Sequence, residues 1–156
     1  MRERPKKLLG ELLIEDGALS RENLSEALAH QKKSGGLIGQ ILIRLGYITE
    51  ENLVVALGRQ LDLPYLPLSQ YAVNKDSVSL LDVDYCRRHF LIICDHDDKR
   101  IYMSTADPLN TTPIGEVEER FKRKVHLFLS TPAEIIQTLD TTFVMTAAKP
   151  EIKKAG

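Results

Sequence analysis

The chain has 156 residues, and its 21 Lys and Arg residues nearly balance its 22 Asp and Glu residues, which gives a formal net charge of -1. A composition of 43% hydrophobic and 28% charged residues is typical of a folded globular protein and excludes wholesale disorder. The near-neutral charge argues against nucleic acid or anionic lipid as a partner. No apolar run approaches the ~18 residues that a membrane span needs, so direct membrane insertion is not expected. The two cysteines, Cys86 and Cys94, form no CxxC pair, and no cleavage site for export follows the charged N-terminus, so a cytoplasmic location is expected.

A tandem repeat dominates the N-terminal part of the chain. Residues 8–31 (LLGELLIEDGALSRENLSEALAHQ) align without a gap on residues 37–60 (LIGQILIRLGYITEENLVVALGRQ), and about half of the aligned positions are identical. Residues 32–36 form a short spacer between the two copies. Because each copy of a stacked repeat buries its apolar face on its neighbour, the two copies are expected to fold as one unit.

Each copy is predicted to form two helices joined by a tight turn. In the first copy a short helix ends near Gly17 and Ser20 caps a second helix, and in the second copy Gly46 and Thr49 hold the same positions. Leu, Ala and Gln then recur at helical spacing through both second helices. The expected fold of this part is a four-helix unit with approximate two-fold internal symmetry.

Gly10 and Gly39 occupy matching positions inside the predicted first helix of each copy. Glycine inside a helix costs about 1 kcal/mol relative to alanine, so a specific reason for its presence is expected. Two explanations remain open, namely close packing of one helix on another or close approach of the backbone to a bound group.

The composition changes at residues 62–68, which contain two prolines and several β-forming residues, and a domain boundary is predicted there. The elements predicted beyond it are a short edge strand at 62–68, a helix near 76–88, a hairpin of strands 90–94 and 100–104, a helix from Thr112-Pro113, a strand at 125–129 and a helix from Thr131-Pro132. The predicted fold class is α+β. It comprises a four-helix tandem-repeat subdomain at 1–62, a small α/β subdomain at 63–145 with a mixed or antiparallel sheet, and a flexible tail or linker at 146–156.

None of the catalytic sequence motifs considered for this chain is present in full, so the sequence does not predict an enzyme. The sequence contains no GxxxxGK[ST] phosphate loop, which excludes ATP hydrolysis by that route. A strand followed by Asp95 and Asp97 resembles the start of an aspartate-based phosphoryl transferase. However, Lys99 replaces the small or hydroxyl residue, and an immediate return strand indicates an ordinary polar turn. The same turn lacks the glycine and the final glutamate of a calcium loop, so no catalytic residue is predicted.

No metal or cofactor is predicted either. The four histidines, His30, His89, His96 and His126, show no metal-ligand spacing. Cys94 lies in an apolar strand and is interpreted as a core residue. The basic residues within 120–124 are typical of a solvated helix end, and an aromatic content of 6% without Trp offers little surface for stacking nucleic acid bases.

The two copies, written as LLGxxLIxxGALxxxxLxxALxxQ and LIGxxLIxxGYIxxxxLxxALxxQ, closely resemble the tandem motif of a known family. This family is the N-terminal regulatory domain, of MshEN type, of type II secretion and type IV pilus assembly ATPases. The resemblance extends over about residues 6–143 and includes residues 63–65 (LPY) and 106–108 (ADP). In the subset typified by the mannose-sensitive pilus ATPase, this domain binds cyclic di-GMP. The resemblance implies a noncatalytic module that binds cyclic di-GMP between its two repeats and couples to a secretion or pilus assembly motor.

The resemblance also implies roles for individual residues. Gly10 and Gly39 would let the backbone approach phosphate and purine, Gln31 and Gln60 would supply amide hydrogen bonds, and the carboxylate of Asp107 would accept from a guanine edge. The apolar side chains that would sandwich the guanine faces are Leu9, Leu13, Ile14, Ile38, Leu42 and Ile43. The complete implied ligand-binding set is Lys7, Leu8, Leu9, Gly10, Leu13, Ile14, Gly17, Gln31, Leu37, Ile38, Gly39, Leu42, Ile43, Gly46, Gln60 and Asp107.

The chain departs from the family pattern where each repeat opens. The ligand-binding subset has arginine at the opening position of the first repeat, whereas this chain has Leu8 there and Leu37 in the second repeat. Lys7 lies just upstream and would offer a point charge instead, and Gln40 stands where an acidic residue is expected. A second hypothesis is therefore a nucleotide-independent docking module. Its partner would be a secretion or pilus ATPase or the cytoplasmic domain of an inner-membrane assembly platform protein.

Overall fold

The computed structural model describes residues 8–148, with side chains through residue 142. The chain divides into two compact units, residues 1–64 and 65–156, which we call the repeat unit and the sheet unit. Lys7 of the predicted site and residues 149–156 of the predicted tail lie outside the described residues.

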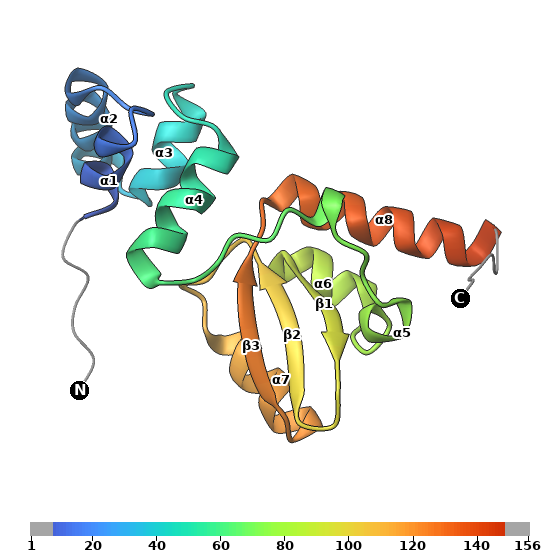
Figure 1. Ribbon diagram of the computed structural model, residues 1–156. Coiled ribbons are helices and arrows are strands. Elements are labelled where there is room, and N and C mark those ends of the chain that lie inside the picture. The colour runs from blue at the N-terminus through green and yellow to red at the C-terminus, as the bar shows by residue number, and fades with distance from the viewer. Residues whose placement is uncertain (1–7, 149–156) are drawn as a thin grey trace. The chain divides into compact units, whose positions relative to one another are not determined.

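The repeat unit folds as two pairs of helices. They are α1 (Leu9–Glu15), α2 (Arg21–Ser34), α3 (Ile38–Arg44) and α4 (Glu50–Leu61) (Figure 1). Ser20 and Thr49 each accept a hydrogen bond from the backbone N–H three residues later, at 3.1 and 3.0 Å, and so cap α2 and α4. Gly17 and Gly46 follow α1 and α3 with φ angles of +77° and +82°, a left-handed conformation that glycine adopts without strain. The predicted helices, caps and turns of both copies are confirmed.

The two copies pack crosswise, with α1 against α4 and α2 against α3. Matching positions of both copies contribute to one shared core. Its buried apolar side chains are Leu12, Leu13, Leu19, Ala27, Ile41, Leu42, Ile48, Leu53, Val54, Ala56 and Leu57. Because both copies contribute to this core, a single copy would leave apolar side chains facing water.

Different polar contacts join the copies at the two matching interfaces. Tyr47 Oη donates to the Glu26 carboxylate at 2.6 Å, and this hydrogen bond raises the pKa of Tyr47. On the other side Arg59 donates to Glu15 at 3.1 Å and also pairs with Asp16. Exposed ion pairs contribute roughly 0–1 kcal/mol each, so the apolar core is the main source of stability.

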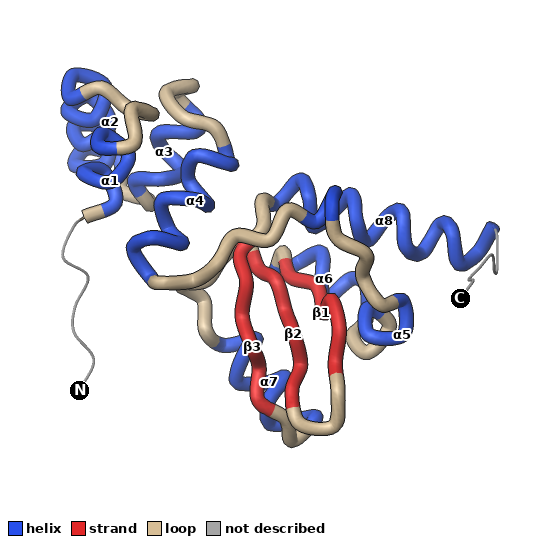
Figure 2. Tube along the Cα trace, viewed as in Figure 1, coloured by secondary structure: helices blue, strands red, loops and turns tan. Residues whose placement is uncertain are grey.

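The sheet unit contains three strands and the remaining helices. Its elements are the 3-10 helix η1 (Leu68–Gln70), α5 (Lys75–Val78), α6 (Val83–His89), β1 (Leu91–His96), β2 (Arg100–Thr105), α7 (Thr112–Phe121), β3 (Lys124–Leu129) and α8 (Pro132–Ala148). The strand order is β1-β2-β3 (Figure 2). Strands β1 and β2 form the predicted antiparallel hairpin, whereas β3 runs parallel to β2 because α7 connects them as a crossover. The sheet is therefore mixed, and the predicted α+β class is confirmed.

Three predicted elements differ from the structure. Residues 62–68 form no strand, because Pro64 and Pro67 lack the N–H groups that a ladder needs, and only an isolated bridge between Tyr65 and Leu129 remains. The single helix predicted near 76–88 is two helices, since the Asp82 side chain accepts from two backbone N–H groups and starts α6 anew. Helix α8 continues to Ala148, three residues into the predicted tail.

Strand β1 lies at the centre of the core of the sheet unit. Residues 91–94 are all buried, which requires cover on both faces of the strand. Helices α6 and α7 lie on one face of the sheet, and α5 and α8 also contact β1 (Figure 1). The edge strand β3 is closed near both ends, because the Val125 N–H donates to the Glu118 carboxylate at 2.9 Å and the Leu66 N–H donates to the Leu129 carbonyl at 2.7 Å.

A buried hydrogen-bond chain fixes the segment before η1 to the sheet. Ser130 Oγ donates to the Leu66 carbonyl at 2.7 Å, so it accepts from Ser104 Oγ, 2.5 Å away, and neither serine has exposed surface.

Ser130→Ala should lower the free energy of unfolding by about 2 kcal/mol, because the Leu66 carbonyl and the Ser104 hydroxyl both lose Ser130 as a hydrogen-bond partner. Ser104→Ala keeps the bond to Leu66 and should cost about 1 kcal/mol. Urea denaturation measures both values, and equal losses would contradict the assigned donor directions.

Candidate ligand site on the repeat unit

The positions that open the two repeats carry the most exposed large hydrophobic side chains among the described residues of the repeat unit. Leu8 and Leu37 are the N-cap residues of α1 and α3, and 70% and 64% of their surfaces are exposed. Each lies one residue before a half-buried side chain of the predicted site, Leu9 or Ile38. The two exposed leucines thus hold matching positions in the two repeats.

Gly10 and Gly39 pack against the second helix of their own copy. A Cβ atom on Gly10 would lie 2.9 Å from both Cδ atoms of Leu24, and one on Gly39 would lie 2.7 Å from Leu53 Cδ1. Real Cβ atoms essentially never come this close to another heavy atom. Of the two explanations left open by the sequence, close helix packing accounts for both glycines without any ligand.

The other apolar residues of the predicted site divide into two groups. Leu13 and Leu42 have no exposed surface and form the core beneath the opening positions. The half-buried ones are Leu9, Ile14, Ile38 and Ile43. In this structure the apolar surface open to a ligand therefore comes from Leu8, Leu37 and this half-buried group.

The glutamines and the turn glycines have local structural contacts. Gln31 Nε2 donates to the Gly36 carbonyl at 3.0 Å and so ties the end of α2 to the spacer. Gln60 is half-buried at the matching place in α4. Gly17 and Gly46 form the turns described above, and a Cβ on either would meet nothing within 4 Å, so backbone conformation rather than space selects glycine there.

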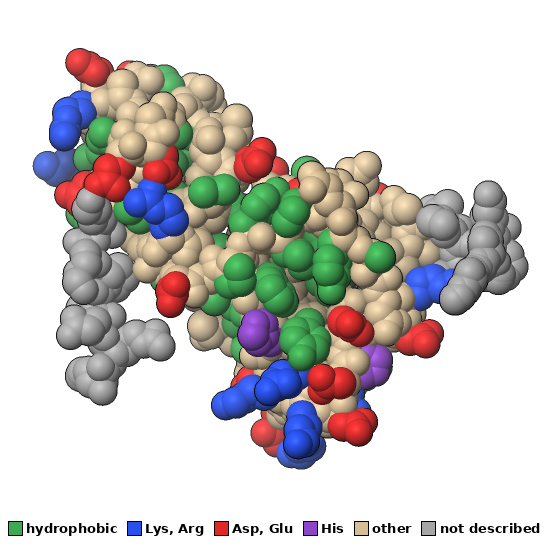
Figure 3. All heavy atoms as spheres, in the orientation of Figure 1, with side chains coloured by type: hydrophobic (Ala, Val, Ile, Leu, Met, Phe, Trp, Pro, Cys, Tyr) green, Lys and Arg blue, Asp and Glu red, His purple; other side chains and the backbone are tan. Residues whose placement is uncertain are grey.

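Charge is distributed unequally between the two repeats. The Glu11 carboxylate accepts from the Leu8 N–H at 3.2 Å, whereas Gln40 holds the matching position in the second repeat. Arg59 is engaged by Glu15 and Asp16. Both acidic and basic side chains lie on the face of the repeat unit shown in Figure 3.

Asp107 belongs to the sheet unit, in the loop between β2 and α7. Its N–H donates to Thr105 Oγ1 at 3.0 Å, and its side chain is exposed. Leu109 in the same loop is 60% exposed, and no sequence pattern predicted this exposure.

The acidic residues after β1 form the polar turn that the sequence predicted. Asp97 accepts from the N–H groups of Lys99 and Arg100, both at 2.8 Å, and these hydrogen bonds lower the pKa of its carboxyl. Among the described residues no group of three or more His, Cys, Asp or Glu side chains is placed to hold a metal ion.

Cys86 and Cys94 are buried free thiols, and burial raises the pKa of each to about 12.

Neither cysteine should react with a thiol reagent at mildly alkaline pH in the native chain, and both should react after unfolding. Since the folded-state pKa values lie above the ordinary value of 9.0, the stability they contribute is complete below about pH 9 and is lost as the pH rises toward 12. Mass spectrometry can follow the labelling of each thiol, and rapid labelling of either one in the native protein would contradict the predicted lack of reactivity.

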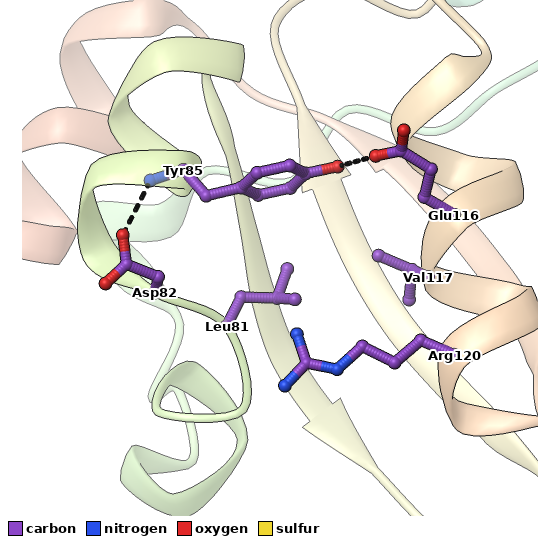
Figure 4. Close-up of a pocket in the computed structure, with 6 residues that line it drawn as sticks. All are labelled: Leu81, Asp82, Tyr85, Glu116, Val117 and Arg120. Carbon is purple, nitrogen blue, oxygen red and sulfur yellow. Dashed lines mark hydrogen bonds between the residues drawn. The ribbon is translucent and has the colours of Figure 1, made fainter.

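A pocket of about 160 Å³ lies between α6 and α7 in the sheet unit (Figure 4). Leu81 and Val117 give it an apolar floor, and Asp82 and Arg120 also line it. Tyr85 Oη donates to Glu116 at 2.7 Å beside it, and burial raises the pKa of Tyr85 to about 12. The sequence offered no indication of this pocket, because its residues come from separate elements with no common motif.

None of the described helices is long and apolar enough to cross a membrane. The structure thus defines a tandem repeat of helices followed by a small mixed-sheet unit, with leucines exposed at matching positions of the two repeats.

The chain belongs to the MshEN domain family, whose model matches residues 61–148. The family predicted from the repeats is thereby confirmed, although the matched residues lie mostly in the sheet unit. A structure of MshE with cyclic di-GMP is 28% identical, with a TM-score of 0.74, and the match covers 88% of this chain and 99% of that one. The N-terminal domain of XpsE is 22% identical with a TM-score of 0.67, over 90% of this chain and 97% of that one, and shows the shared fold. A comparison with curated protein sequences finds no significant match.

Proposed function

We propose that this chain is a noncatalytic regulatory module that binds cyclic di-GMP between its two helical repeats and passes the signal to a cytoplasmic secretion or pilus assembly motor. The observation that carries the proposal is the similarity over almost its whole length to MshE, whose structure contains cyclic di-GMP. A ligand close to two-fold symmetric suits a site made of two matching halves, and Leu8 and Leu37 are exposed at matching places.

Calorimetric titration of cyclic di-GMP into the purified chain tests the proposal, with GTP and cyclic di-AMP as controls. Saturable binding that is selective for cyclic di-GMP is the expected result. Amide signals of residues 8–14 and 37–43 should shift during the titration in NMR spectra. The absence of heat and of shifted signals at high ligand concentration would refute the proposal.

A second candidate is a docking module for a protein partner, such as the ATPase or the inner-membrane platform protein of the same system. The exposed Leu8 and Leu37, together with Leu28 at 46% exposed on α2, favour it because they offer apolar surface without requiring a nucleotide. Co-purification with such a partner in the absence of cyclic di-GMP, and loss of it in Leu28→Glu, would favour docking. A partner that binds only in the presence of cyclic di-GMP would favour the regulatory module instead.

A further inference from the structure

The pocket between α6 and α7 has a size and an apolar floor that suit one small apolar group. Its volume is about 160 Å³, close to the roughly 150 Å³ of an engineered apolar cavity that binds benzene. Leu81 and Val117, which are 6% and 1% exposed, form the floor, and Tyr85 also lines the pocket. Transfer of a leucine-sized apolar group from water onto this floor is therefore favourable.

Charged side chains of both signs surround this floor. They are Asp82 at the start of α6 and Glu116 and Arg120 on α7, and all three are exposed. Two carboxylates and one guanidinium give the lining residues a formal net charge of -1. This charge disfavours a purely anionic ligand, whereas a ligand with both an ammonium group and a carboxylate finds a partner for each.

Both carboxylates are held in place by hydrogen bonds and can accept more of them. Tyr85 Oη donates to Glu116 at 2.7 Å (Figure 4), and burial raises the pKa of Tyr85 to about 12, so its hydroxyl remains a donor at neutral pH. Asp82 accepts from the N–H groups of Asp84 and Tyr85, at 3.1 and 3.3 Å. Arg88 lies over the Tyr85 ring, 5.9 Å from its centre, and is not a lining residue. Since a carboxylate accepts about four hydrogen bonds, Asp82 and Glu116 can both accept from an ammonium group.

The Arg120 guanidinium forms no ion pair with any carboxylate of the described residues. Figure 4 shows its side chain extending from α7 toward Leu81, and its guanidinium carbon lies 4.8 Å from the centre of the Phe121 ring. Glu119, the preceding residue on α7, pairs with Lys122 at 3.0 Å. The N–H groups of Arg120 are thus open to a carboxylate of a ligand.

We propose that this pocket binds a free apolar α-amino acid of about leucine size. The side chain of the amino acid lies on the apolar floor, its ammonium group lies at the Asp82 and Glu116 carboxylates, and its carboxylate lies at Arg120. The pocket is formed by the sheet unit alone, so the inference does not depend on cyclic di-GMP binding by the repeats. Because the charged groups are exposed and screened by water, a Kd on the order of 1 mM is expected.

NMR titration of the full chain with L-leucine tests the inference. The amide signals of residues 81–85 and 116–120 should shift saturably. L-alanine should bind more weakly by about tenfold or more, because it lacks most of the apolar side chain. N-acetyl-L-leucine lacks the ammonium group and L-leucinamide lacks the carboxylate, so each should bind about threefold more weakly than L-leucine.

Two variants test the assigned charge contacts. Arg120→Gln should lose the preference for L-leucine over L-leucinamide, and Glu116→Gln should lose most of the preference over N-acetyl-L-leucine. Glutamine still accepts from Tyr85 Oη, so Glu116→Gln keeps the local hydrogen bond. Glu119→Gln, at an exposed carboxylate on the same helix that does not line the pocket, is the matched control and should keep both preferences.

Three results would overturn the inference. The first is the absence of saturable shifts at the lining residues with L-leucine, and the second is equal binding of L-leucine and L-alanine. The third is equal binding of L-leucine and L-leucinamide by the unaltered chain, which would indicate the N-terminus of a peptide rather than a free amino acid. A loss of preference in Glu119→Gln as large as that in Arg120→Gln would also contradict the assigned contacts.

Discussion

Gly39→Val should lower the free energy of unfolding of the repeat unit by about 2–3 kcal/mol, the typical cost of extra atoms in a packed core. A Cβ at this position would lie 2.7 Å from Leu53 Cδ1, and Leu53 is only 7% exposed, so it has little room to move. Gly10→Val should cost less, because Leu24 is half-buried and can turn toward solvent. Amide hydrogen exchange across α1–α4 measures the stability of this unit directly.

Gly115 provides the matched control within the same chain. It lies in α7, and a Cβ there would meet nothing within 4 Å. Gly115→Ala should therefore raise stability by up to about 1 kcal/mol through helix propensity, whereas Gly39→Ala should not. The smaller side chain in Leu53→Val makes room for a Cβ at position 39, so the double variant Gly39→Ala with Leu53→Val should recover part of any stability that Gly39→Ala loses. If Gly39→Val kept full stability but lost ligand binding, close approach to a ligand would be the correct explanation for the glycine, and the packing explanation would be wrong.

The sequence predicted the repeat unit well because its determinants are local. A cap such as Ser20 and a left-handed glycine such as Gly17 act within a few residues, and the duplication shows each of them twice. In the sheet unit the decisive contacts are between distant residues. The parallel pairing of β3 with β2 depends on how α7 crosses the sheet, which no local pattern encodes.

The sequence singled out the candidate site residues but did not predict how exposed each side chain is. Helical spacing groups residues on one face of a helix, yet it does not say which of two adjacent leucines faces the core. Leu8 is 70% exposed and Leu9 beside it is half-buried, although the family resemblance gave both a ligand-binding role. The difference between Glu11 and Gln40 could be seen in the sequence, but the contact from Glu11 to the Leu8 N–H depends on the helix cap.

Under the proposed function, the exposed leucines limit how this chain would recognise a dinucleotide. An arginine at the opening position would hold phosphate or guanine by paired, charge-assisted hydrogen bonds. A leucine side chain offers neither charge nor hydrogen bond, so in the proposed site its contribution would come from burial of apolar surface against the ligand. Affinity in this chain should consequently depend on salt far less than in a relative that uses arginine.

Replacement of Leu37 by residues of opposite charge should change cyclic di-GMP affinity in opposite directions. Leu37→Glu should weaken binding by at least tenfold, and together with Leu8→Glu by about a hundredfold, or about 2.7 kcal/mol, because apolar contact is lost and a like charge faces the phosphates. Leu37→Arg should bind more tightly at low salt and acquire a marked salt dependence. Since 64% of Leu37 is exposed, these variants should fold normally, which circular dichroism can verify.

Leu28→Glu and Leu28→Arg, at another exposed leucine of the repeat unit, are the controls. They should leave affinity within twofold of the unaltered chain, or about 0.4 kcal/mol. Equal affinity of the glutamate, leucine and arginine forms at position 37 would show that the ligand does not contact the start of α3.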